Sequence, residues 1–203
     1  MRAFRCGDQR GFTLVELMVV IAIVGMLAAL AIYGVRRYIM SSKSGEARNL
    51  VGQISRAAAD SYSRETVLSE VVALGTYSSQ AYHQLCASAI PVPSSVPSAR
   101  KYQPNNSPGL DFSTGNATQG WKCLRFEVHD PIYYQYNYVR DSTAFCTAYD
   151  CSPTTLTPNY EIAAIGDLDN DGEYSAFILN GAVDPRAPQL VRATSIHVQN
   201  EFE

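Results

Sequence analysis

Residues 10–16 read Arg-Gly-Phe-Thr-Leu-Val-Glu, and they open an apolar run that lasts until about Ile32. From Leu14 to Ile32 the only charged side chain is that of Glu16. The run is close to the roughly 20 residues that a transmembrane helix needs. A carboxylate inside such a helix costs about 2.5–3.5 kcal/mol on insertion scales, so Glu16 needs a compensating partner. Three arginines and one aspartate precede the run, which favours a cytoplasmic N-terminus. The sequence therefore predicts a membrane-inserted N-terminal segment.

The stretch Gly-Phe-Thr-Leu-Val-Glu-Leu, followed by an apolar helix, resembles the processing site of type IV pilins and the related pseudopilins. In that family a membrane peptidase cuts after the glycine, and the new N-terminal amine is methylated. The resemblance implies a cut between Gly11 and Phe12, with Phe12 as the methylated terminus. It also implies that Glu16 meets the positive N-terminus of a neighbouring subunit during filament assembly. The motif covers about the first thirty residues of the chain.

The same segment has two other interpretations, a secretory signal and a plain single-span anchor. A secretory signal would use Ala29-Leu30-Ala31 as its cut site and release a soluble domain that begins near Ile32. The apolar run is longer than the roughly 7–15 residues of a usual signal core, and it contains Glu16. A plain single-span anchor leaves Gly11, Phe12 and Glu16 unexplained. Both alternatives therefore fit the residues less well than a prepilin segment.

The expected organisation has three parts. Residues 1–11 form a cleaved leader, residues 12–33 form a transmembrane and filament-core helix, and residues 34–203 form a periplasmic or extracellular head that includes the second half of the long helix. Of 16 basic and 19 acidic side chains, the leader holds three and one, which leaves 13 and 18 in the mature chain. Because this balance is acidic and shows no basic patch, nucleic acid is not expected as a partner.

Beyond Tyr33 the pattern remains helical, with apolar residues at three- and four-residue steps. These residues are Leu50, Val51, Ile54, Ala57, Ala58 and Tyr62. No proline interrupts residues 12–90. We therefore expect one helix from about Thr13 to about Glu65, apolar on all sides in its first half and on one stripe in its second. A second short helix is expected from Ser78 to Ala89.

The second half of the chain has the composition of loops and strands. Residues 90–120 hold five prolines among many polar residues and glycines, which indicates a long surface loop. Alternation with a period of two predicts strands within residues 124–128, 134–138, 160–165, 174–179 and 190–198. The predicted fold class is α+β: a long N-terminal helix, transmembrane in its first half, packed on a four- or five-stranded antiparallel sheet. The pilin resemblance implies the same fold.

The cysteines predict disulfides in an exported domain. Cys6 lies in the leader, and Cys86, Cys123, Cys146 and Cys151 remain after its removal. An even number of cysteines outside the cytosol favours two disulfides, and four cysteines allow three pairings. We favour Cys146–Cys151, which closes a short loop, and Cys86–Cys123, which ties the long connection to the sheet.

One expected turn gathers acidic residues: residues 166–173 read Gly-Asp-Leu-Asp-Asn-Asp-Gly-Glu. Oxygen ligands at alternate positions followed by glycine resemble the first half of a calcium loop. An EF-hand would need glutamate at the twelfth loop position, which is Ile178 here, so the loop is not an EF-hand. The other interpretation is an acidic hairpin without a cation. Both interpretations stay open, with these candidate calcium ligands: Asp167, Asp169, Asp171 and Glu173.

The sequence contains none of the common catalytic motifs, and we expect no enzymatic activity and no required cofactor, with calcium as the one optional ion. The resemblance implies a structural subunit of a type IV pilus, a homo-oligomeric helical filament for surface attachment or twitching motility. Its partners would be the prepilin peptidase, the pilus assembly machinery and the inner membrane, before export into an extracellular filament on a bacterial surface. The alternatives are a type II secretion pseudopilin, a minor or DNA-uptake pilin, and a secreted or anchored calcium-binding domain.

Overall fold

The computed structural model of the chain describes residues 11–66, 74–75, 82–187 and 189–203. The chain divides into two compact units, Met1–Ile39 and Met40–Glu203. One helix, α1 (Leu14–Ser63), contributes to both units. Its bounds agree closely with the helix that the sequence predicts.

The first unit contains the beginning of α1, and every described side chain from residue 11 to residue 39 is exposed. Apart from Glu16, the surface from Leu14 to Ile32 is apolar on all sides; Leu14 is 74% exposed and Leu30 is 71% exposed. In length and composition, α1 is the one helix among the described residues that could cross a membrane. A helix that is hydrophobic all round needs lipid or other helices to cover it.

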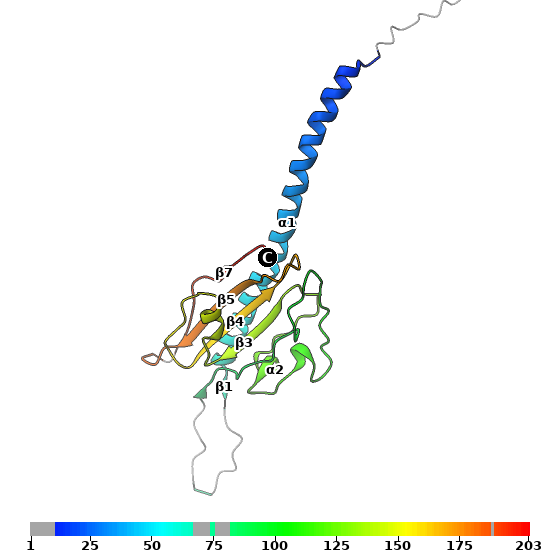
Figure 1. The fold of residues 1–203 in the computed structure, drawn as a ribbon. Coiled ribbons are helices and arrows are strands. Elements are labelled where there is room, and N and C mark those ends of the chain that lie inside the picture. The colour runs from blue at the N-terminus through cyan, green and yellow to red at the C-terminus, as the bar shows by residue number, and fades with distance from the viewer. Residues whose placement is uncertain (1–10, 67–73, 76–81, 188) are drawn as a thin grey trace, which may run out of the picture. The chain divides into compact units, whose positions relative to one another are not determined.

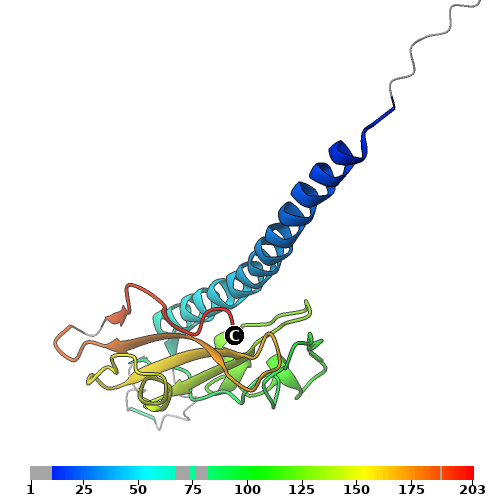
Figure 2. The same ribbon diagram turned by 45° about the horizontal axis from the view of Figure 1, so that its top comes forward.

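In the second unit, α1 packs one stripe of side chains against a sheet (Figures 1 and 2). The buried apolar residues of this stripe recur at three- and four-residue steps, as the 3.6-residue period of a helix requires. They are Ala47, Val51, Ile54 and Ala58, each 0% exposed, and Tyr62. The apolar stripe predicted from the sequence is therefore the core-facing side of the helix.

The sheet has five strands, all antiparallel to their neighbours. The order is β3-β4-β5-β6. β7 also pairs with β5, at residues 176–178, whereas β6 pairs with residues 181–183. In the register of the sheet, Gln135 of β3 pairs with Ile165 of β4, and Ile165 pairs with Ala176 of β5. The bounds are β3 (Gln135–Arg140), β4 (Asn159–Gly166), β5 (Ser175–Val183), β6 (Leu190–Arg192) and β7 (His197–Gln199). The predicted α+β class, with an antiparallel sheet of four or five strands, is confirmed.

Each face of the sheet carries its own hydrophobic cluster, because successive side chains of a strand point to opposite faces. The face toward α1 includes Tyr160, Ile162 and Ala164 of β4. The opposite face carries Ala163 and Ile165, which are covered by α3 (Ala144–Ala148) and the residues that follow it. Both faces of the central strand are therefore buried, and β4 is buried along its whole length.

Two predicted strands differ in the structure. Residues 120–124 form the short helix α2 (Gly120–Leu124), and the segment after it is not part of the sheet. Phe126 and Val128 are nevertheless buried on alternate positions. An extended segment buries every second residue whether or not its backbone joins a ladder, so a period of two did not prove a strand. The predicted strand 190–198 is two strands, β6 and β7, separated at residues 193–196.

Two further expectations need correction or lie partly outside the described residues. The short helix predicted for residues 78–89 falls partly on undescribed residues; between residues 82 and 89 the chain forms β2 (Tyr82–His83) and no helix. β2 pairs with β1 (Glu65–Thr66). The proline-rich loop was expected to lack core residues, but Val92 and Phe112 are 0% and 1% exposed. Val92 exchanges backbone hydrogen bonds with Tyr136, which places the loop against the edge of the sheet at β3.

Candidate functional site at the start of helix α1

The start of α1 is closed by reciprocal hydrogen bonds between Thr13 and Glu16. The backbone N–H of Thr13 donates to Glu16 Oε2 over 3.0 Å, and the Thr13 hydroxyl donates to the same oxygen over 2.9 Å. In return the Thr13 hydroxyl accepts the backbone N–H of Glu16 over 3.2 Å. This is a capping box, in which a threonine before the helix and a glutamate three residues later satisfy each other's unpaired N–H groups.

The capping box explains why a carboxylate stands at this position of an apolar helix. The first N–H groups of a helix have no partner within the helix, and their partial positive charge favours an anion nearby. Glu16 supplies that anion from the first turn of α1. Sequence reasoning sought the partner of Glu16 in an N-terminal amine and missed Thr13. The signal was present, because threonine followed three residues later by glutamate before an apolar run is a capping-box pattern.

The two residues of the expected processing site lie just before the capping box. Gly11 and Phe12 precede the helix, and Phe12 is 90% exposed. No described atom lies within 4 Å of the place where a Cβ on Gly11 would stand. The chain is therefore accessible here, which is what a peptidase that binds it closely at its cut needs. Residues 1–10, the rest of the expected leader, lie outside the described part of the chain.

The acidic residues of the expected calcium turn lie between β4 and β5. The carboxylate oxygens of Asp167, Asp169 and Asp171 lie within 4.8 Å of one another, and Glu173 is not part of this group. Asp167 is 3% exposed, and its Oδ1 accepts the N–H of Asn170 over 2.6 Å. Asp171 Oδ1 accepts the N–H of Glu173 over 2.8 Å. Two of the carboxylates therefore stabilise the turn itself, as a hairpin without a cation would use them.

The carboxylates of the β4–β5 turn also affect the pKa of Glu203. Slight desolvation and the negative charges of the turn raise the pKa of Glu203. Oxygen-only donors suit a hard cation such as calcium, but the hydrogen bonds inside the turn do not require one. The structure brings three of the four candidate ligands together.

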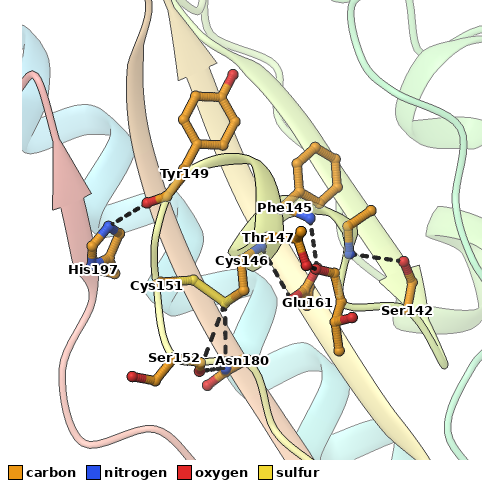
Figure 3. Close-up of a disulfide and its surroundings, with 12 residues drawn as sticks. Ser142, Phe145, Cys146, Thr147, Tyr149, Cys151, Ser152, Glu161, Asn180 and His197 are labelled. Atoms are coloured by element: carbon orange, nitrogen blue, oxygen red, sulfur yellow. Dashed lines mark hydrogen bonds between the residues drawn. A yellow bond between two sulfur atoms is a disulfide. The ribbon is translucent and has the colours of Figure 1, made fainter.

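The cysteines form two disulfides, Cys86–Cys123 and Cys146–Cys151, which is the pairing favoured from the sequence. Figure 3 shows the second disulfide in a loop that covers one face of the sheet. Glu161 of β4 accepts the N–H groups of Phe145 over 2.9 Å and of Cys146 over 3.3 Å. Burial raises the pKa of Glu161, and these two hydrogen bonds partly offset the effect. The buried carboxylate thereby fixes α3 and its disulfide to the sheet.

Comparison with known proteins assigns the N-terminal segment. The family model of the prokaryotic N-terminal methylation motif matches residues 6–32. The prepilin-type segment predicted from the sequence is confirmed. It contains the expected cut site, the capping box and most of the apolar part of α1.

Similar curated proteins are fimbrial. The fimbrial protein EcpC of Eikenella corrodens is 48% identical over 59 residues, which are 29% of this chain and 39% of the relative. A type IV major fimbrial protein FimA of Dichelobacter nodosus is 47% identical over 49 residues, 24% of this chain and 31% of the relative. These relatives are fimbrial proteins and not enzymes, and neither name mentions calcium. No solved structure matches the chain.

These matches cover less than a third of the chain. The matched region spans about two fifths of the first relative and less of the second. The similarity therefore supports the prepilin-type segment directly.

Proposed function

We propose that this chain is a structural subunit of a type IV pilus. One observation carries the proposal: Glu16, the sole charge between Leu14 and Ile32, stands in a capping box directly after an accessible Gly11-Phe12 bond, within the matched motif. An exported soluble domain or a simple anchor would not need this combination of a single charge in the apolar run, a capping box and an accessible bond before it. The fimbrial names of the relatives support the same function.

The proposed processing step cuts between Gly11 and Phe12, and Phe12 becomes the methylated N-terminus. The new amine then lies four residues before Glu16, at the same end of α1. Both hydrogen bonds from Thr13 go to Oε2 of Glu16, so Oε1 lies outside the capping box. We assign to this carboxylate a second role in the filament, as the partner of the N-terminal amine of a neighbouring subunit. A buried amine without such a partner is strongly disfavoured.

The apolar first part of α1 has two successive environments in this proposal. Before assembly it lies in the inner membrane, with the head outside the cytoplasm. In the filament the same surface packs against copies of itself, so that the exposed side chains of residues 12–33 become a common core. The membrane and the filament core are alike apolar, which lets one sequence serve both states.

The alternatives within the family remain a type II secretion pseudopilin and a minor or DNA-uptake pilin. The word "major" in the name of the matching Dichelobacter protein favours a pilus subunit. The net acidic charge of the mature chain gives no support to direct DNA binding. A calcium-binding domain of another class would not need the prepilin-type segment.

The decisive test combines the mature N-terminus with filament imaging. Mass spectrometry of protein from the native cell should show a chain that begins with methylated Phe12, and electron microscopy should show filaments that are absent when the gene is deleted. A mature chain that begins near Ile32 would support a secreted domain instead. Correct processing combined with unchanged filaments in the deletion strain would contradict the role of filament subunit.

A further inference from the structure

A cavity at the end of α1 is lined by three arginines. Arg56 and Asp60 lie one turn apart on α1, Arg64 directly follows the end of the helix, and Arg125 joins them from the segment after α2. The cavity has a volume of about 460 Å³, and Leu124 and Phe126 form part of its wall. The charges of Arg56, Asp60, Arg64 and Arg125 sum to a net positive lining, which we call the arginine pocket.

The cations of this pocket are held close together by the fold. Arg64 Nη2 donates to the carbonyl oxygen of Cys123, which ties the side chain to the disulfide-bonded end of α2. Desolvation and the charge of Arg125 lower the pKa of Arg64, and Asp60 offsets this only in part. Arg125 itself has a left-handed backbone, with φ 55° and ψ 40°. A carboxylate that entered the pocket would relieve the repulsion between Arg64 and Arg125.

Exposed carboxylates lie at the opposite end of the same unit, in the β4–β5 turn. We call Asp169, Asp171 and Glu173 the acidic turn; all three are exposed. Arg48 of α1 lies over the ring of Phe177, close to this end of the sheet. Further along α1, the Ser55 hydroxyl lies 3.2 Å from the hydroxyl of Tyr160, near the other end of β4.

The helix therefore runs from the acidic turn toward the arginine pocket. Between Arg48 and Arg64 it advances by about 24 Å at a rise of about 1.5 Å per residue. Figure 1 shows the β4–β5 turn and the C-terminus at one end of this unit, and β1, which follows α1, at the other. The two groups of opposite charge thus lie too far apart to meet within one subunit.

We propose that the acidic turn of one subunit docks into the arginine pocket of a second copy of this chain. Arginine and carboxylate form paired, charge-assisted hydrogen bonds, which set orientation as well as attraction. A contact between two different patches of identical subunits is heterologous, and repeating it generates an open helical assembly. The contact rests on the filament function proposed above and specifies how the heads of neighbouring subunits meet.

The test is a charge swap in cells that produce the full chain. Arg125→Asp reverses the charge at one position and cancels the net positive charge of the pocket, and aspartate tolerates the left-handed backbone at this position. Asp169→Arg likewise reverses the charge at one position and places a cation in the turn. Each single variant places like charges in the interface, so we expect at least about a tenfold loss of sheared filament protein. The double variant restores opposite charges in exchanged places and should recover most of the filament yield.

Lys122→Asp is the matched control, because Lys122 is an exposed cation on α2 that does not line the pocket. It should leave the filament yield within about twofold of the wild type, as expected for a surface change outside the contact. Fluorescence of Trp121, the single tryptophan of the chain, shows whether each variant head is folded. Trp121 is fully buried and donates its indole N–H to the carbonyl of Ile90.

The outcomes separate this contact from the filament function itself. If the wild type builds filaments and both single variants build them equally well, the proposed contact is wrong and the filament proposal stands. Loss in the folded single variants without recovery in the double variant would also overturn it, because the pocket would then bind a different acidic partner. A processed wild-type chain that builds no filament would overturn both proposals. As a second measurement, oxidation of Arg125→Cys/Asp169→Cys filaments should link subunits into a ladder that neither single cysteine variant gives.

Discussion

Glu16 Oε2 lies 3.0 Å from the backbone nitrogen of Thr13 and 2.9 Å from its hydroxyl oxygen, so the only charge of the apolar segment has a partner within its own helix. The carboxylate is thus held at the head of α1 before any neighbouring subunit arrives. Its structural role and its proposed role in assembly can be separated, because glutamine also completes a capping box but carries no charge.

The first prediction separates charge from capping at position 16. Glu16→Gln should be processed and inserted into the membrane but should not enter filaments, because it keeps the cap and loses the charge. Thr13→Ala should weaken the helix start by about 0.5–2 kcal/mol and still assemble, because it keeps the carboxylate. Immunoblots of sheared filaments and of membranes measure both steps. Wild-type filament yield from Glu16→Gln would show that the charge is not needed.

The second prediction concerns processing. Gly11→Leu should leave an uncut precursor in the membrane, because a bulky side chain keeps the peptidase from fitting the backbone at its cut. The fold should be unchanged, since the described chain leaves space around Gly11. Intact-mass spectrometry distinguishes the precursor from a mature chain starting at Phe12. A normal mature mass in this variant would remove the proposed cut site.

The third prediction ranks the two disulfides. Cys86–Cys123 closes a loop with a sequence separation of 37, and Cys146–Cys151 one with a separation of 5. By chain entropy, the longer loop should contribute about 4 kcal/mol and the shorter about 2 kcal/mol. Denaturant unfolding of the full chain in detergent, followed by Trp121 fluorescence, compares the two paired cysteine-to-serine variants. A larger loss from Cys146→Ser/Cys151→Ser would contradict the ranking.

The fourth prediction is a pH dependence of head stability. Burial raises the pKa of Glu46 above its ordinary value of 4.5, although the Tyr133 N–H, the Tyr136 hydroxyl and the charge of Lys101 act in the opposite direction. The folded state therefore binds this proton more tightly than the unfolded chain. The resulting stability is fully present below pH 4.5 and is lost as the pH rises through the folded pKa.

Glu46→Gln should flatten this decline, because the amide oxygen can still accept the N–H of Tyr133 and does not titrate. Burial also raises the pKa of Glu161, so part of the slope should remain in Glu46→Gln and disappear in the double variant with Glu161→Gln. Unfolding free energies between pH 4 and pH 8, read from Trp121 fluorescence in detergent, test this. A slope that both variants leave unchanged would exclude these carboxyls as its source.

Local patterns in the sequence determined the N-terminal segment and most of the secondary structure. The apolar run with its single carboxylate defined α1, and alternation in residues 134–138, 160–165 and 174–179 located β3, β4 and β5. These features depend only on residues that are close in sequence. They are the period of a helix or strand and a cap between residues three positions apart. The capping box was equally readable, since Thr13 and Glu16 are one helical turn apart.

The tertiary structure decided what depends on residues far apart in the sequence. Alternation at Phe126 and Val128 showed burial but not pairing, because a strand exists only where another strand meets its backbone. The sequence favoured one of three possible cysteine pairings, and the folded chain establishes it by bringing Cys86 to Cys123. The arginine pocket joins Arg64, directly after α1, to Arg125, directly after α2. No local pattern links these residues; they meet because α1 and α2 share one hydrophobic core.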